Sequence, residues 1–161
     1  MSDACDGCIK LDQDSNAGLD DIVADIEILY PTYSSELSKA DFWTLMAIKA
    51  IERGAQVGGT TLPDIDFKYG RVDCALSPDD DIEYEFPGAS MDHDSMFAYF
   101  ESHFGYTADE TTALMGAHTQ GQNHIVDSGY DGQFVEGGFI KFNNQYYIGM
   151  ISLESLFMRS N

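Results

Sequence analysis

The sequence predicts an all-α protein, mainly helical, with long irregular loops. Apolar residues recur at spacings of three and four in several stretches, as they do on the buried face of a helix. Two of these stretches open with capping-box patterns, and glycines and prolines punctuate the segments between them. The length of 161 residues fits a single domain over residues 1–161, and 43% hydrophobic residues indicate a folded chain rather than a disordered acidic one.

The first two helices are expected over 18–30 and from residue 39 onward. Asn16 is expected to cap the first helix and Pro31 to stop it. Ser38–Asp41 forms a capping box for the second helix, and Gly54 is expected to end it. The apolar stripes are Leu19, Ile22, Val23, Ile26, Leu29 and Tyr30 in the first helix, and Phe42, Leu45, Met46 and Ala50 in the second.

Further helices follow a mostly irregular stretch over 54–92. One is expected from Asp92 to Phe104, closed by Gly105. Its inward residues are Met96, Phe97, Phe100 and Phe104. A second capping box, Thr107–Glu110, opens a helix that is expected to end near 116–118. Residues 151–157 are expected to be helical as well.

The charge balance excludes two classes of partner. The chain has 28 acidic and 8 basic side chains, a net charge of −20. Nucleic acids and anionic membrane surfaces are bound by lysine and arginine clusters, so neither is an expected partner. No run of 18 or more apolar residues predicts a membrane span, and residues 1–5 lack the features of a signal peptide.

Three cysteines leave several pairings open. Cys5 and Cys8 have the spacing of a zinc knuckle or a redox dithiol, but no second CxxC or HxxxH supplies further zinc ligands. A helix, which the redox motif requires, does not follow either. Structural cysteines are therefore the preferred interpretation, with the partners of Cys5, Cys8 and Cys74 undetermined.

Among the histidines at 93, 103, 118 and 124, His118 has the most suggestive surroundings. It ends an apolar helix, and the small residues Gly116 and Ala117 leave room for a flat, bulky group beside it. A neutral imidazole there could bind a metal through one ring nitrogen. The alternative is an ordinary structural or surface histidine.

Taken together, the motifs resemble those of the plant, fungal and bacterial type of haem peroxidases, most closely the invertebrate members. They occur in the family's order over nearly the whole chain. The proximal-histidine motif GAHTxG is similar to residues 116–121, GAHTQG. The family's GRxD and S-x-AD motifs match residues 70–73 and 38–42, and its FDNxYY element is similar to residues 142–147. The stretch after the family's distal helix resembles residues 5–9 together with 16–19.

The resemblance implies a role for each matching residue. His118 would be the proximal ligand of the iron of haem b, and Pro87 would lie at the haem edge. Asn16 would hydrogen-bond the distal histidine and fix its tautomer. The remaining implied roles are calcium ligation by Asp6 and Thr119, and a buried structural ion pair between Asp41 and Arg71.

The sequence also departs from the family pattern. The family's distal histidine and arginine move a proton on hydrogen peroxide and stabilise charge as the O–O bond breaks. In the family, both residues precede the segment that residues 5–8 resemble, and in this sequence only residues 1–4 precede it. Neither Arg53 nor Arg71 lies in the motif that carries the family's distal arginine. The aspartate that holds the proximal histidine lies beyond the FDNxYY element, and 148–161 contain none. We therefore expect a partial haem peroxidase domain, with a partner for Cys5 upstream.

The function implied by the resemblance is haem-dependent reduction of hydrogen peroxide with oxidation of a small electron donor, in the response to oxidative stress. Secretion is implied too, and cysteines that form disulfides are compatible with it. The alternative is a catalytically inactive, acidic, calcium- or haem-binding protein of the extracellular matrix.

Overall fold

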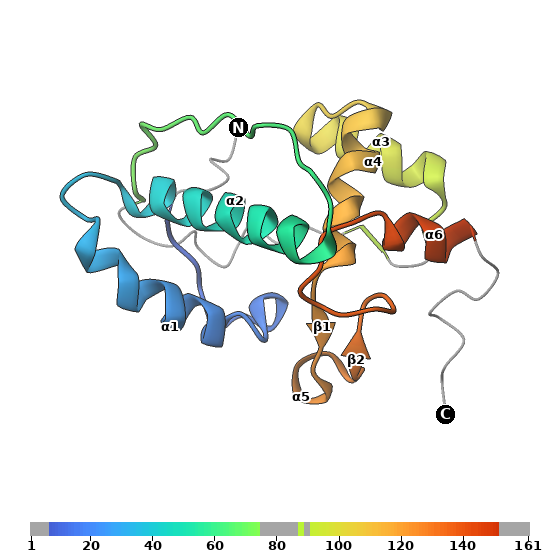
Figure 1. Ribbon diagram of the computed structural model, residues 1–161, viewed down its shortest axis with the longest axis horizontal. Coiled ribbons are helices and arrows are strands. Elements are labelled where there is room, and N and C mark those ends of the chain that lie inside the picture. The colour runs from blue at the N-terminus through green and yellow to red at the C-terminus, as the bar shows by residue number, and fades with distance from the viewer. Residues whose placement is uncertain (1–6, 75–86, 89–90, 152–161) are drawn as a thin grey trace.

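The computed structural model describes residues 7–74, 87–88 and 91–151, and these form a mainly helical fold, which confirms the predicted all-α class. Figure 1 shows α1 and α2 at one end of the molecule, with the other elements around the carboxyl end of α2. The α-helices are α1 (Asp20–Leu29), α2 (Lys39–Gly58), α3 (His93–Phe104), α4 (Ala108–Met115), α5 (Ile125–Ser128) and α6 (Gln145–Ile151); the 3₁₀ turns are 14–16, 30–32 and 116–119.

One short antiparallel ladder accompanies the helices. Strand β1 (Gln122–Asn123) pairs with β2 (Gly132–Gln133), so that Gln122 faces Gln133 and Asn123 faces Gly132. The sequence analysis did not predict this pair, because two-residue strands carry no periodic signal. The ladder closes the segment between the two strands, which contains α5.

Helix α1 begins two residues later than predicted and is not capped by Asn16. Its N-cap position is Leu19, which provides no side-chain hydrogen bond, and Asn16 lies in the preceding 3₁₀ turn. The helix ends at Leu29, and Pro31 stands inside a following 3₁₀ turn, where its missing N–H costs nothing. No α1 residue is fully buried, and Ile22 is exposed.

The carboxyl end of α1 and the turn after it meet the first turn of α2. Phe42 is buried, and its ring lies 5.4 Å from the rings of both Tyr30 and Tyr33. Beside them, Nζ of Lys39 lies 3.0 Å from a carboxylate oxygen of Glu27. An aromatic cluster and a half-buried ion pair thus hold the two helices together.

The prediction that Gly54 ends α2 is wrong. The helix continues to Gly58 and ends at Gly59, which takes the left-handed conformation with φ +71°. Gly54 is instead a packing position: its carbonyl accepts a hydrogen bond of 3.0 Å from the N–H of Phe142, and an added Cβ would overlap the side-chain amide of Gln120. An added Cβ at Gly58 would lie 2.9 Å from the carbonyl oxygen of Phe142.

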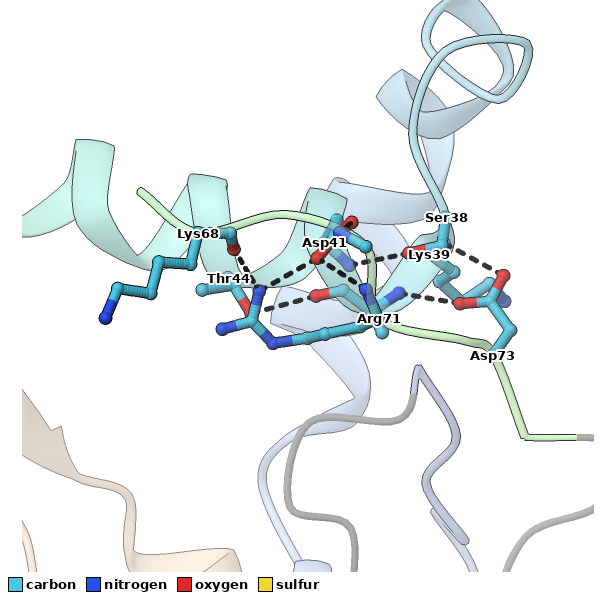
Figure 2. A network of polar contacts seen from close by, with 9 residues as sticks. Ser38, Lys39, Asp41, Thr44, Lys68, Arg71 and Asp73 are labelled. Atoms are coloured by element: carbon cyan, nitrogen blue, oxygen red, sulfur yellow. Dashed lines mark hydrogen bonds and ion pairs between the residues drawn. The ribbon is translucent and has the colours of Figure 1, made fainter. Parts of the chain in front are cut away.

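The amino end of α2 is tied to the segment 70–73 by two carboxylates (Figure 2). Asp73 accepts hydrogen bonds of 2.9 and 2.8 Å from the N–H groups of Lys39 and Ala40, two of the first-turn donors that lack a helical partner. Ser38 accepts from the N–H of Asp41, as the capping box predicts. The carboxylate of Asp41 does not complete the box, because it binds Gly70 and Arg71 instead.

Asp41 is the buried charge of this network. Only 3% of the residue is exposed, and its carboxylate accepts from the Gly70 N–H at 2.6 Å and from Nη1 of Arg71 at 2.8 Å. The hydrogen bond from Gly70, together with the hydrogen bonds and charge of Arg71, lowers the pKa of Asp41 below its ordinary value, against the opposing effect of burial. The Arg71 side chain is 34% exposed, so only the acidic partner is buried.

The chain before α1 joins the same network. Gly7 is buried with φ +78°, and an added Cβ would lie 2.9 Å from the Ala40 nitrogen. Cys8 forms a disulfide with Cys74, one residue beyond Asp73. This pairing answers the question that the sequence left open for two cysteines, while Cys5 lies outside the described residues.

Helices α3 and α4 follow the predicted boundaries closely. Asp92 caps α3 by accepting from the Ser95 N–H at 2.8 Å, and Gly105 closes the helix with φ +73°. The capping box between Thr107 and Glu110 is confirmed. The prediction that Phe104 points inward is wrong, since it is 52% exposed among the described residues, whereas Phe100 is buried.

Helix α6 lies in the aromatic segment that the sequence analysis did not predict to be helical. Its seven residues run from Gln145 to Ile151. The helix predicted over 151–157 falls outside the described residues apart from Ile151. No helix among the described ranges is long and apolar enough to cross a membrane.

Replacing Asp41 by asparagine (Asp41→Asn) is expected to lower the thermal midpoint at pH 7 by several degrees. Because the folded-state pKa lies below the unfolded value of about 3.9, stabilisation by the ionised carboxylate is complete above that value and is lost as pH falls through the folded pKa. The difference between wild type and variant should therefore shrink below about pH 4. Asp66→Asn, at an exposed carboxylate before the segment 70–73, is the matched control. A pH-independent difference would contradict this account.

Candidate functional site

The candidate site is built on the turn that continues α4. Residues 116–119 form a 3₁₀ turn directly after Met115, the last residue of α4. Gly116 is buried there, and an added Cβ would lie 2.8 Å from the hydroxyl of Tyr147. The glycine therefore allows α6 to pack against the turn. This packing leaves the next two side chains, Ala117 and His118, exposed.

His118 points outward from the turn, with one ring nitrogen engaged by the protein. Its Nδ1 lies 3.1 Å from the carbonyl oxygen of Met115. Among the described residues, the structure shows no hydrogen bond to its Nε2. The imidazole is thus anchored through one nitrogen and accessible through the other, as a metal-binding histidine requires.

Aromatic side chains border the imidazole of His118. The ring of Tyr146 stacks on it, with 5.4 Å between centroids and 25° between planes, and Phe134 lies 6.1 Å away. Burial first, and then the neighbouring Tyr147, raises the pKa of Tyr146 above its ordinary value. Tyr146 is therefore a neutral phenol at physiological pH.

Tyr147 fastens α6 to α4 on the other side of the turn. Its hydroxyl donates a hydrogen bond of 2.5 Å to the carbonyl of Thr112, and its ring meets that of Tyr146 edge-on at 5.2 Å. Sequence reasoning singled out the aromatic segment 142–147, but it did not assign these contacts. They depend on the packing of α6 on α4, which local sequence does not encode.

Gly121 places Phe134 beside the site. The N–H of Gly121 donates to Phe139 at 2.9 Å, and its carbonyl accepts from Phe134 at 3.2 Å. Its φ is +116°, and an added Cβ would lie 2.7 Å from the Phe134 ring. Only glycine meets both demands readily. Phe134 itself stands among glycines, so the sequence offered no signal for its position.

Thr119 faces the interior rather than His118's side of the turn. It is fully buried, and its hydroxyl donates to the carbonyl of Asn143 at 3.1 Å. A cavity of about 110 Å³ adjoins it. The lining includes oxygen-bearing side chains of Thr119, Glu136, Asn143 and Gln145. No group of three or more His, Cys, Asp or Glu residues suited to a metal occurs within 7–74, 87–88 and 91–151.

The other predicted site residues lie in different parts of the fold. Asn16 donates from Nδ2 to the carbonyl of Lys10 at 2.7 Å, near the start of α1. Pro87 is half-buried, and Asp6 lies outside the described residues. Asp41 and Arg71 meet at the amino end of α2. The structure thus assembles His118 with Met115, Tyr146 and Phe134, which the sequence analysis did not assign to the site.

Comparison with known proteins identifies similar chains. The family described as Peroxidase matches residues 1–158. The chain is 32% identical over 139 residues to the mitochondrial cytochrome c peroxidase of Candida albicans, an alignment that covers 84% of this chain and 35% of the relative. It is 31% identical over 140 residues to cytosolic L-ascorbate peroxidase 2 of Oryza sativa subsp. japonica, covering 87% of this chain and 51% of the relative. A provisionally named heme-binding peroxidase of Mycosarcoma maydis is 32% identical over 140 residues (87% and 40%). The chain therefore spans about half or less of the length of these curated relatives.

The packing that positions the site can be tested at Gly54. Gly54→Ala should lower the midpoint of thermal unfolding, because the new methyl group displaces the Gln120 amide from its 3.2 Å hydrogen bond with Ile140. In a Gln120→Ala background the same substitution should cost less, since the overlapping amide is gone. The measurement is a double-mutant cycle. Strict additivity of the two substitutions would rule out the proposed overlap.

Proposed function

This chain belongs to the peroxidase family, in its plant, fungal and bacterial haem-dependent type, and from this we propose that it supplies the haem-holding part of an enzyme that reduces hydrogen peroxide. A small electron donor is oxidised in the same reaction. The observation that carries the proposal is the imidazole of His118, anchored at Nδ1 and open at Nε2. We propose the response to oxidative stress as the setting, because hydrogen peroxide is the substrate.

The residues around His118 fit a haem group. The available donor is a neutral imidazole nitrogen, which is a common axial ligand of haem iron. Bound haem supplies the redox chemistry of peroxide reduction. The side chain of Ala117 beside His118 is small, and both residues are exposed. Pro87 would line the haem edge, by the resemblance of its motif.

Asn16 is proposed as a positioning residue for the family's distal histidine. Its Nδ2 is committed to the carbonyl of Lys10, which leaves Oδ1 as an acceptor. An acceptor is what the N–H of an imidazole requires, and such a hydrogen bond would hold the other nitrogen ready to take a proton from peroxide.

The two arginines in the described part of the chain are engaged elsewhere. Arg71 pairs with Asp41, and Nη1 of Arg53 donates to the side chain of Gln56 at 2.6 Å. We therefore assign neither to the stabilisation of charge on peroxide. Asp41 and Arg71 are proposed as scaffold, because they hold the segment 70–73 against α2.

Calcium binding at Thr119 is proposed on the family motif and on the adjoining cavity. Thr119, Glu136, Asn143 and Gln145 in its lining carry oxygen atoms, which calcium prefers as ligands, and Lys141 lines the same cavity. Asp6, the other residue proposed to bind calcium, lies outside the described residues.

Secretion is proposed on the Cys8–Cys74 disulfide alone, since disulfides persist in oxidising compartments. Two of the relatives are named as mitochondrial and cytosolic proteins, so these relatives do not support it.

Titration with hemin tests the proposed haem ligand. The wild-type chain should develop a Soret band, and His118→Ala should abolish it because the axial nitrogen is lost. His124→Ala is the matched control, since His124 is also exposed and lies six residues away. Circular dichroism should show both variants folded. An unchanged hemin spectrum in His118→Ala would refute the assignment.

Turnover tests the proposed division of roles. With hemin bound, guaiacol oxidation by the 161-residue chain should stay at the rate of free hemin. The reason is that Arg53 and Arg71 contact Gln56 and Asp41, and we assign neither to the O–O cleavage step. A rate far above free hemin, lost in Arg53→Lys or Arg71→Lys, would contradict this assignment.

A further inference from the structure

We propose that the exposed face of α1 is a docking surface for a basic, amphipathic α-helix of a partner protein. The surface is a row of apolar side chains bordered by carboxylates. The row, called the α1 stripe below, consists of Leu19, Ile22, Ile26 and Leu29. The proposal goes beyond the proposed function, because none of these residues belongs to the haem-holding part of the chain.

The α1 stripe is largely open to solvent. Leu19 is 39% exposed, Ile22 53% and Leu29 46%, while Ile26 is half-buried. Helix α1 lies at the edge of the molecule beside α2 (Figure 1), and α2 covers only part of its apolar surface. Single exposed apolar residues are common on protein surfaces, whereas a continuous row of them is typical of a surface that binds another chain.

The spacing of the α1 stripe indicates that its partner is helical. Its members follow one another at alternating intervals of three and four residues, as along the seam between two packed helices. Such a seam is filled by a second helix with apolar residues at the same spacing. A β-strand would need unpaired backbone groups, which the side of a helix does not offer.

Carboxylates beside the α1 stripe determine the charge of the partner. Asp21 and Asp25 are exposed and four residues apart, so they share one side of α1 and repel each other. Helix α1 contains no lysine or arginine that could relieve this repulsion, and Lys39 of α2 is paired with Glu27 instead. Lysine or arginine residues that flank the apolar face of a bound helix would supply the missing positive charge.

The charge of the chain disfavours a second copy of itself as the occupant. Each chain carries a net charge of −20, so two copies repel each other. A pair of α1 stripes in contact would also bring Asp21 and Asp25 of both copies to one interface. A helix of a different, basic protein fills the seam without this cost.

The test measures binding of fluorescently labelled synthetic peptides to the whole 161-residue chain by anisotropy. Each peptide has about three heptads, a length at which helices become stable. The first has leucine at the a and d positions and lysine at e and g, the second has the same composition in scrambled order, and the third has glutamate in place of lysine. The first should bind about 10-fold more tightly than the second, because only it has an apolar seam, and the third should not bind.

Variants of the chain test whether the first peptide lies on the α1 stripe. Ile22→Gln combined with Leu29→Gln should reduce its affinity about 10-fold, to that of the scrambled peptide, because the apolar contact is lost. Ile125→Gln combined with Val126→Gln is the matched control, since these residues are also apolar and exposed but lie in α5. Circular dichroism should show both variants folded, as expected for changes at exposed positions.

A third variant tests the charge of the surface. Asp21→Asn combined with Asp25→Asn should weaken binding of the first peptide several-fold and reduce its dependence on salt concentration. Equal affinity of the wild-type chain for the first and the scrambled peptide would overturn the inference, as would unchanged binding in the variant with Ile22→Gln and Leu29→Gln. Sedimentation that shows a dimer of the chain, dissociated by those two substitutions, would overturn it in favour of a second copy.

Discussion

The close contact of α2 with residues 139–142 is the constraint on which the candidate site depends. It requires Gly54 and Gly58, because any side chain at either position would enter the space of Gln120 or the backbone of Phe142. Gln120 stands two residues after His118, so the turn that carries the imidazole is set against α2 at this point. The helix extends past Gly54 because the glycine is needed for packing and not for termination.

The packing at the amino end of α2 is held by charged side chains rather than by small ones. Asp73 satisfies two backbone donors of the first turn, and the buried Asp41 holds the backbone of Gly70 and the guanidinium of Arg71. In a chain of net charge −20, most carboxylates are exposed and repel one another. A small number of them are structural, and the Cys8 disulfide reinforces the same corner.

Local patterns in the sequence were sufficient where local chemistry decides the structure. Thr107 and Glu110 cap α4 as predicted, and the motif identified His118, whose Nδ1 contacts a backbone carbonyl and which follows the small residues Gly116 and Ala117. Two of the failures are tertiary. The sequence alone does not distinguish a glycine that ends a helix from one, such as Gly54, that allows close packing of another segment. The residues around Tyr146 in the sequence likewise do not indicate that its ring stacks on His118.

The central proposal is that His118 binds haem iron through its Nε2. An experimental structure of the hemin-bound chain tests it most directly. The account predicts iron bound to Nε2 of His118, with the Nδ1 contact to Met115 and the Tyr146 stack retained. Iron bound to any other residue, or a hemin seated away from the turn 116–119, would contradict it.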